Sequence, residues 1–199
     1  MAKTSVKINV PDPTRGKTRL TWDSTYEWTV KFFQEHPELK VGVEIGVAGG
    51  QHIKALVENT SIEKIYGVDP YCGDCWDDMK GYFDLDTDYG GFDGLYVEVK
   101  EMLSVYGNKV ELIRKKSLEA APEFEDETLD FVFIDAAHDY ENCFNDIGFW
   151  HHRVRKGGYV MGHDWDHAGY PGVQKAVVEH YGDKVIGVPG PVHVWYVQV

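Results

Sequence analysis

Short apolar runs alternate along the chain with segments whose apolar residues recur every three or four positions. The runs occupy residues 41–45, 65–68, 109–116, 129–134 and 159–162. The periodic segments occupy residues 21–36, 51–59, 92–106, 140–153 and 172–182. A short apolar run bounded by turn residues is typical of a buried parallel strand, and the longer period is typical of an amphipathic helix. The alternation predicts an α/β fold, with a parallel sheet covered by helices.

The C-terminal part of the chain departs from this alternation. After the helix at 172–182, apolar runs at 184–188 and 193–199 flank a Pro-Gly-Pro turn at 189–191. Two apolar runs joined by a short turn predict an antiparallel hairpin. Added to the parallel strands, the hairpin predicts a doubly wound, Rossmann-like, seven-stranded mixed sheet with an antiparallel C-terminal strand.

The helix at 140–153 carries several large apolar residues on one side. Its spacing predicts that Phe144, Ile147, Phe149 and Trp150 face the core. The glycines of Lys156-Gly157-Gly158 then predict a helix stop, because glycine adopts the left-handed conformation that ends helices.

The domain organisation follows from the positions of irregular segments. Residues 1–20 are polar and lack periodicity, so we expect an N-terminal arm that covers the domain or joins the subunits of a homodimer. Residues 21–199 then form one domain. An acidic, aromatic stretch at 72–91 interrupts it and is expected to act as a lid over the acceptor pocket. Cys72 and Cys75 lie within it without a second pair at zinc-finger spacing, so a structural zinc site is disfavoured.

Composition narrows the classes of partner. The net charge of −13 argues against binding to the phosphate backbone of nucleic acids. No stretch approaches the roughly 20 apolar residues that cross a bilayer. We therefore expect a soluble, cytoplasmic protein without a membrane partner, acting on a small-molecule substrate.

A glycine turn and an acid indicate a nucleoside-cofactor site. The first strand, at 41–45, runs into a turn with Gly46, Gly49 and Gly50, where backbone can approach a ligand ahead of a helix N-terminus. Asp69 ends the second strand, about 20 residues later, where a carboxylate can accept both hydroxyls of a ribose. Glu44, inside the first strand, suits the ammonium of an amino acid better than a diphosphate.

The order of these residues resembles motifs one and two of class I S-adenosylmethionine-dependent methyltransferases, E-x-G-x-x-G-G followed by an acid after the second strand. The resemblance implies S-adenosyl-L-methionine as cofactor, held by Glu44, the glycine turn and Asp69. It also places Ser117, after the third strand, near the adenine. A helix N-cap explains Ser117 equally well, and the two interpretations stay open.

Further acids and histidines follow the next two strands. Asp135 ends the fourth strand and His138 comes three residues later, while His163 and Asp164 end the fifth. Because ligands of open α/β sheets bind outside the carboxyl ends of the strands, these side chains should converge with Glu44 and Asp69. The other histidines, at positions 151, 152, 167, 180 and 193, are interpreted as structural or solvated.

The phrase from Phe133 to Trp165, with I-D-x-x-H after strand four and H-D after strand five, resembles macrolide-sugar O-methyltransferases. That resemblance implies catalytic roles for Asp135 and His138, with His138 as general base, and metal ligation by Asp135 and Asp164. His163 stands where those enzymes carry an acid, and imidazole favours transition metals over Mg²⁺. Whether a divalent metal is bound, and whether His163 ligates it or only donates a hydrogen bond, stays open.

Together these features predict an S-adenosylmethionine-dependent methyltransferase that acts on a small-molecule or saccharide hydroxyl. The alternatives are a non-catalytic protein that binds S-adenosylmethionine and a nicotinamide-dependent oxidoreductase. The second is disfavoured by Glu44, by Ala48 where a dinucleotide site needs glycine, and by the closing hairpin.

Overall fold

The computed structural model describes residues 23–73 and 89–199, and it shows a seven-stranded sheet in the order β3-β2-β1-β4-β5-β7-β6. The first five strands in this order are parallel, and β7 runs antiparallel to both β5 and β6. The predicted mixed sheet with an antiparallel C-terminal strand is confirmed. The strands are β1 (Val41–Ile45), β2 (Lys64–Val68), β3 (Val110–Ile113), β4 (Leu129–Ile134), β5 (Val154–Gly162), β6 (Ile186–Val188) and β7 (Val194–Gln198).

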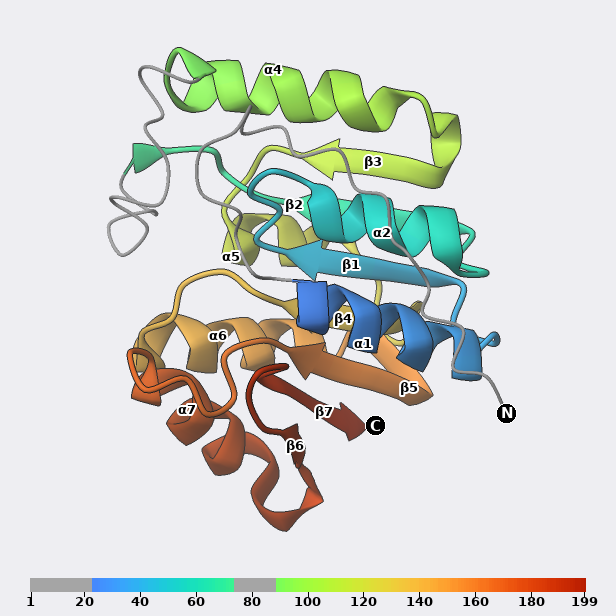
Figure 1. Cartoon of the computed structure of the whole chain (residues 1–199). Helices are drawn as coiled ribbons and strands as arrows, with labels where there is room; N and C mark the ends of the chain where they lie inside the picture. The colour runs from blue at the N-terminus through green and yellow to red at the C-terminus, as the bar shows by residue number, and fades with distance from the viewer. Residues whose placement is uncertain (1–22, 74–88) are drawn as a thin grey trace.

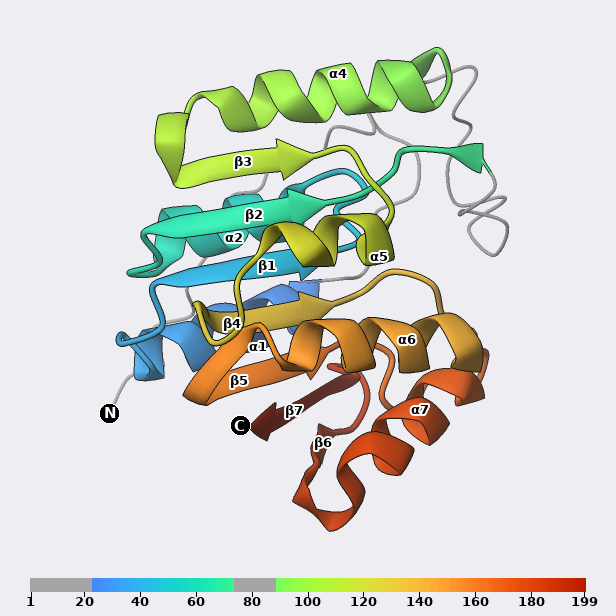
Figure 2. The ribbon, with the colours of Figure 1, turned by 180° about the vertical axis from the view of Figure 1, so that it is seen from behind.

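Helices cover both faces of the sheet. On one face lie α1 (Asp23–Glu35), α2 (Gln51–Asn59) and α4 (Gly91–Ser104), as Figure 1 shows. On the other lie α5 (Ser117–Ala120), α6 (Tyr140–His151) and α7 (Pro171–Tyr181), seen in front in Figure 2. Alternate residues of each central strand enter one of two apolar cores, Phe131 and Phe133 on the first face and Val132 and Ile134 on the second.

The predicted arm at 1–20 lies outside the described residues, and so does most of the predicted lid at 72–91, including Cys75. Within the part of the chain that the structure describes, no helix combines the length and the apolar character that a bilayer crossing requires.

The glycine pair at 157 and 158 corrects one prediction, because it does not end a helix. The helix α6 ends at His151, and both glycines lie inside β5. There the register against β4 shifts, so that Leu129 pairs with Val154 but Phe131 pairs with Tyr159. Gly157 has φ +80°, and a Cβ on Gly158 would lie 2.4 Å from the Asp130 carbonyl oxygen. Glycine is therefore needed for a bulge rather than for a stop.

The inner face of α6 also differs from the prediction at one position. Ile147 and Trp150 are fully buried, but Phe149 is 47% exposed, so its assignment to the core was wrong. The buried position on that face is instead taken by a carboxylic acid, Asp146, which is 5% exposed.

Ser117 explains how α6 tolerates this acid. Its Oγ accepts a hydrogen bond from Trp150 Nε1 at 2.8 Å, and its hydroxyl donates to Asp146. Ser117 is the first residue of α5, and the N-cap, Lys116, makes no side-chain capping bond. The hydroxyl therefore joins α5 to α6 beneath the sheet, and Lys116 rather than Ser117 is the N-cap, so the capping interpretation is wrong. The position of Ser117 near an adenine stays a prediction.

Asp146 predicts a pH-dependent stability. Burial raises its pKa from 3.8 to about 6, because desolvation outweighs the hydrogen bond from Ser117. The free energy of unfolding has its full value below the pKa that Asp146 has in the unfolded chain. It falls by about 3 kcal/mol as the pH rises through the pKa that Asp146 has in the folded protein. Asp146→Asn should abolish this loss, so urea unfolding should show the variant about 3 kcal/mol more stable than wild type at pH 7 and equal to it near pH 3.5. Glu125→Gln, at an exposed acid, is the control. The assignment would be contradicted if the free energies of unfolding of wild type and Asp146→Asn changed with pH in parallel.

Candidate active site

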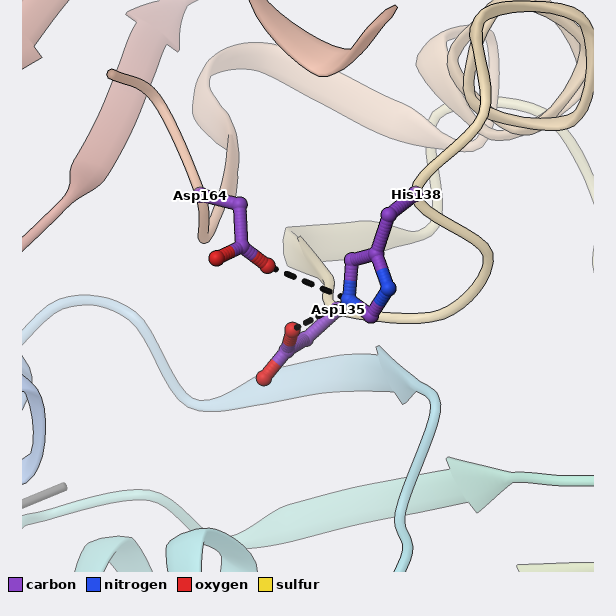
Figure 3. Close-up of side chains that lie close together, drawn as sticks. All are labelled: Asp135, His138 and Asp164. Atoms are coloured by element: carbon purple, nitrogen blue, oxygen red, sulfur yellow. Dashed lines mark ion pairs between the residues drawn. The ribbon is translucent and has the colours of Figure 1, made fainter. Parts of the chain in front are cut away.

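Two carboxylates and two histidines meet at the carboxyl ends of β4 and β5. His138 Nε2 lies 3.1 Å from Asp164 Oδ2 and 3.8 Å from Asp135 Oδ1 (Figure 3). His163 Nδ1 lies 3.3 Å and 3.6 Å from the same two oxygens. The convergence predicted for these four side chains is confirmed by the geometry, and we call them the acid–histidine cluster.

Backbone contacts between neighbouring strands fix the acids of the cluster. Asp135 N donates to Ile45 O at 2.8 Å and His163 N donates to Ile134 O at 3.1 Å, so the pairing of β1, β4 and β5 continues past the strand ends. Asp164 then turns the chain with φ +60°, a left-handed conformation that Asp tolerates better than most residues. Its carboxylate is thereby directed back toward the end of β4.

The four charges of the cluster stabilise one another. Burial lowers the pKa of His138, but hydrogen bonds and charge from Asp135 and Asp164 outweigh it and raise the pKa to about 11. The same balance raises the pKa of His163 to about 10. Burial opposes ionisation of both aspartates as well, yet the histidines hold the pKa of each below its ordinary value. Each ionised group of the cluster therefore favours the ionised form of its neighbours of opposite charge.

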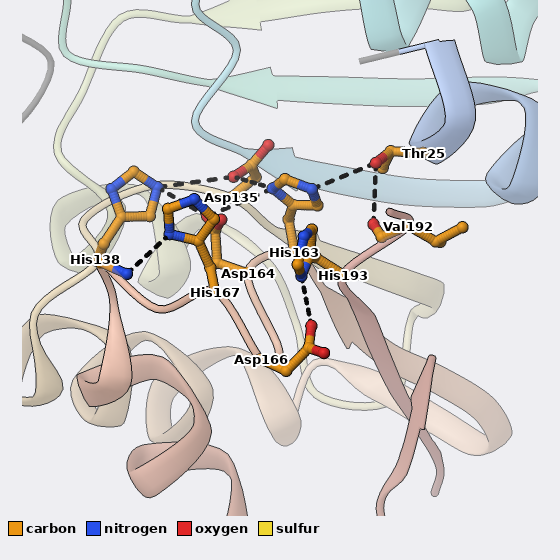
Figure 4. A network of polar contacts seen from close by, with 10 residues as sticks. Thr25, Asp135, His138, His163, Asp164, Asp166, His167, Val192 and His193 are labelled. Atoms are coloured by element: carbon orange, nitrogen blue, oxygen red, sulfur yellow. Dashed lines mark hydrogen bonds and ion pairs between the residues drawn. The ribbon is translucent and has the colours of Figure 1, made fainter. Parts of the chain in front are cut away.

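A second layer of polar residues surrounds the cluster on the side of α1 and β7. His163 Nε2 lies 3.2 Å from Thr25 Oγ1 (Figure 4). The ring of Tyr170 stacks on His138 at 4.1 Å between centroids. His193 forms an ion pair with Asp166, and its ring lies 6.4 Å from that of His163. His167 stacks on the same Tyr170. His167 and His193 therefore lie near the site, and their interpretation as structural or solvated side chains stays a prediction.

The glycine turn between β1 and α2 packs against the end of β4. Gly46 has φ +88°, and a Cβ there would lie 1.9 Å from the Asp135 carbonyl oxygen. Gly50 has φ +75° and serves as the N-cap of α2 without a side-chain capping bond. At Gly49 a Cβ would meet the side chain of Gln51 at 2.4 Å. The glycine turn is thus in contact with the backbone of a cluster residue.

Asp69 closes this turn from the end of β2. It is 2% exposed, and its Oδ2 accepts bonds from Val47 N and Ala48 N at 3.0 Å each. Its Oδ1 accepts from Tyr71 N at 2.8 Å. The carboxylate predicted to hold a ribose thus holds the backbone of the turn itself, and its contact with a nucleoside stays a prediction.

Glu44 lies apart from the cluster, facing α2. It is 2% exposed, and its Oε2 lies 2.7 Å from His52 Nδ1, whose Nε2 lies 2.9 Å from Thr29 Oγ1. Burial raises the pKa of Glu44, and the charge and hydrogen bond of His52 offset part of that effect. His52 was missed from the sequence, although its position eight residues after Glu44 places it in the first turn of α2.

This sheet order, with a glycine turn after β1 and acids at the following strand ends, defines the fold of S-adenosylmethionine-dependent methyltransferases. The chain belongs to a family of methyltransferase domains, whose model matches residues 43–165. Membership of that family supports S-adenosylmethionine as the cofactor and removes the nicotinamide alternative.

Solved structures share the fold at low sequence identity. A Podospora anserina methyltransferase in its SAH-bound form has a TM-score of 0.63 at 15% identity, with 87% of this chain and 76% of that chain covered. The O-methyltransferase NovP has a TM-score of 0.61 at 17% identity, with 85% and 78% covered. A TDP-rhamnose 3'-O-methyltransferase of calicheamicin biosynthesis has a TM-score of 0.57 at 17% identity, with 86% and 77% covered.

One curated relative is an uncharacterized protein of Acanthamoeba polyphaga mimivirus. It is 27% identical over 154 residues, which are 75% of this chain. The match spans 62% of the viral protein's length.

The contact between Gly46 and Asp135 can be tested by adding one methyl group. Gly46→Ala should lower the free energy of unfolding by several kcal/mol, about 1–3 from the left-handed φ and a similar amount from the clash with Asp135 O. Gly107→Ala is the matched control, because Gly107 has φ +55° and a Cβ added there would meet nothing within 4 Å. If urea unfolding showed the same loss of unfolding free energy for both variants, the turn would not be in close contact with the end of β4.

Proposed function

We propose that the protein transfers the methyl group of S-adenosylmethionine to a hydroxyl oxygen of a small molecule, with a saccharide as the preferred class of acceptor. The observation that carries the proposal is the acid–histidine cluster at the ends of β4 and β5, on the rim where open α/β sheets bind ligands. A protein that only binds the cofactor has no need of a base beside buried carboxylates.

The turn from Gly46 to Gly50 supports the cofactor part of the proposal. It presents left-handed residues and the uncapped N-terminus of α2, whose first N–H groups lack side-chain partners from a cap. We propose that Glu44, Gly46, Gly49, Gly50 and Asp69 line the cofactor site. Glu44 lies behind the turn and acts on the cofactor through its charge. Asp69 holds the turn in the conformation that admits the nucleoside.

The cluster also fits a divalent cation. Asp135, His138 and Asp164 each offer a ligand atom, and these atoms lie within 4.8 Å of one another. Carboxylate oxygens with imidazole nitrogen form a donor set used by Mn²⁺, Fe²⁺, Co²⁺ and Zn²⁺. A cation bound by Asp135 and Asp164 would offset their charge, ease deprotonation of His138 and polarise the acceptor oxygen.

S-adenosylmethionine, held by Glu44, the Gly46–Gly50 turn and Asp69, would supply an electrophilic methyl group and would leave as the neutral thioether. His138 and Asp164 would hold the acceptor hydroxyl whose oxygen takes that methyl group. His138 Nε2 would take the hydroxyl proton in the neutral form of the ring, which requires the charges of Asp135 and Asp164 to be offset. Asp164, 3.1 Å from that nitrogen, holds the imidazolium. Alignment of oxygen and methyl supplies up to about 7–11 kcal/mol, and the base adds about 10²–10⁴-fold.

Oxygen and saccharide specificity are supported by two of the structural neighbours, named as an O-methyltransferase and a TDP-rhamnose 3'-O-methyltransferase. The net charge of −13 disfavours a nucleic-acid acceptor. We keep the homodimer as a proposal for the segment at 1–20.

The proposal is tested by turnover. Purified protein with radiolabelled S-adenosylmethionine should methylate members of a panel of nucleotide sugars, free glycosides and catechols, assayed with EDTA and with each of Mg²⁺, Mn²⁺, Co²⁺ and Zn²⁺. Products should carry a methyl ether by mass spectrometry. Tight binding of S-adenosylhomocysteine without transfer to any acceptor would instead favour the non-catalytic binder, and no binding would refute both.

The role of His138 gives a sharper prediction. His138→Gln should retain affinity for S-adenosylhomocysteine by calorimetry and lose about 10²–10⁴-fold in kcat, because glutamine cannot accept the hydroxyl proton. His180→Gln is the control, since that ring bonds Phe144 O on α6 rather than the cluster. Unchanged turnover in His138→Gln would remove this residue from the mechanism.

A further inference from the structure

A buried threonine of α1 contacts the ring nitrogen of His163 that points away from the carboxylates. Thr25 Oγ1 lies 3.2 Å from His163 Nε2 and donates a hydrogen bond to Val192 O at 2.9 Å (Figure 4). The threonine is 5% exposed. The contact joins α1, the end of β5 and the loop before β7, segments 138 and 167 residues from Thr25 in the sequence.

Proton counting assigns the direction of this bond. A hydroxyl has one hydrogen, and the Val192 carbonyl can only accept, so the hydrogen of Thr25 belongs to Val192. Thr25 therefore accepts from His163, and Nε2 of His163 carries a hydrogen. The remaining ring nitrogen, Nδ1, then faces Asp135 and Asp164.

The distances around Nδ1 also match those between two ligands of one ion. His163 Nδ1 lies 3.3 Å from Asp164 Oδ2 and 3.6 Å from Asp135 Oδ1, so both carboxylates contact the same ring nitrogen. Two ligand atoms bound at about 2.1 Å to one ion lie about 3.0 Å apart at a right angle and about 3.4 Å apart at a tetrahedral angle. A histidine that ligates a metal also donates its other N–H to an oxygen, as His163 does to Thr25.

We infer that His163 Nδ1 is a third ligand, with Asp135 and Asp164, of a transition-metal ion, and that Thr25 is the positioning residue that directs this nitrogen at the metal. The inference deepens the proposed function, on which it rests for the role of the metal. His138 is left as the base. Because an imidazole is a softer ligand than a carboxylate, the site binds Mn²⁺, Co²⁺ or Zn²⁺ more tightly than Mg²⁺.

Metal binding to the full-length protein tests the inference without any turnover. Wild type should bind Co²⁺ by calorimetry, with a visible absorption band that reports nitrogen ligation, and should bind Mg²⁺ more weakly. Thr25→Val keeps the shape of the side chain but removes the hydroxyl, and it should weaken Co²⁺ binding about 10–100-fold. Thr25→Ser restores the hydroxyl and should restore the affinity. His163→Asp should reverse the preference toward Mg²⁺.

Thr29→Val is the matched control. Thr29 lies one turn further along α1, is fully buried and bonds His52 rather than His163, so its loss should leave Co²⁺ affinity unchanged. In Thr25→Val, nitrogen-15 NMR of His163 should also show loss of the Nε2–H tautomer. Thermal melts establish that each variant is folded.

The outcomes separate this inference from the proposed function. Equal Co²⁺ affinity in wild type, Thr25→Val and Thr25→Ser would overturn the role of Thr25, and absence of metal binding in wild type would overturn ligation by His163. In either case, binding of S-adenosylhomocysteine and methyl transfer in EDTA would leave the proposed function standing. Failure to bind S-adenosylhomocysteine would refute the function whatever the metal result.

Discussion

Two carboxylates at the ends of adjacent parallel strands are kept close by the positive charge between them. Asp135 and Asp164 repel each other, and two unit charges 4 Å apart interact by about 4 kcal/mol at an effective dielectric constant of 20. His138 and His163 each contact both acids and compensate this repulsion. The cluster is therefore a unit, and removal of any member leaves a buried charge without its partner.

The same constraint links the cluster to the cofactor turn. Gly46 is pressed against the Asp135 carbonyl, and Asp69 fixes the next two residues of the turn through their N–H groups. In the proposed function, the segments that would position the methyl donor and the acceptor are in direct backbone contact. In a reaction that needs little covalent chemistry from the protein, such rigid alignment is the main contribution that a fold can make.

The sequence predicted those elements that depend on local patterns of apolar and polar residues. Apolar runs placed the strands, and strand ends placed the four cluster residues, because parallel strands deliver their carboxyl ends to one edge. The mistaken predictions concern contacts that local pattern does not encode. Ser117 bonds a tryptophan 33 residues away, Phe149 satisfies the helical period but faces solvent, and Gly157 serves a strand bulge rather than a helix end.

Thr25 and His52 were missed for a related reason. Thr25 belongs to a helix with the pattern of an ordinary amphipathic segment, and its histidine partner lies 138 residues later. Nothing in the spacing of α1 distinguishes a threonine that bonds a histidine from one that caps or faces water. The one available signal was the pair Thr25 and Thr29, four residues apart on the buried side, since buried hydroxyls need partners.

The charge of the third ligand bears on which acceptor the site can accommodate. Asp135, Asp164 and a neutral His163 bring two negative charges, which one divalent ion balances. An acid at position 163 would bring a third and would oppose any negative charge developing on the acceptor oxygen. With histidine there, the acceptor oxygen of the proposed function would approach a bound metal ion without this repulsion, and its proton would move to His138. In that case the imidazole would affect both the choice of metal and the acidity of the hydroxyl.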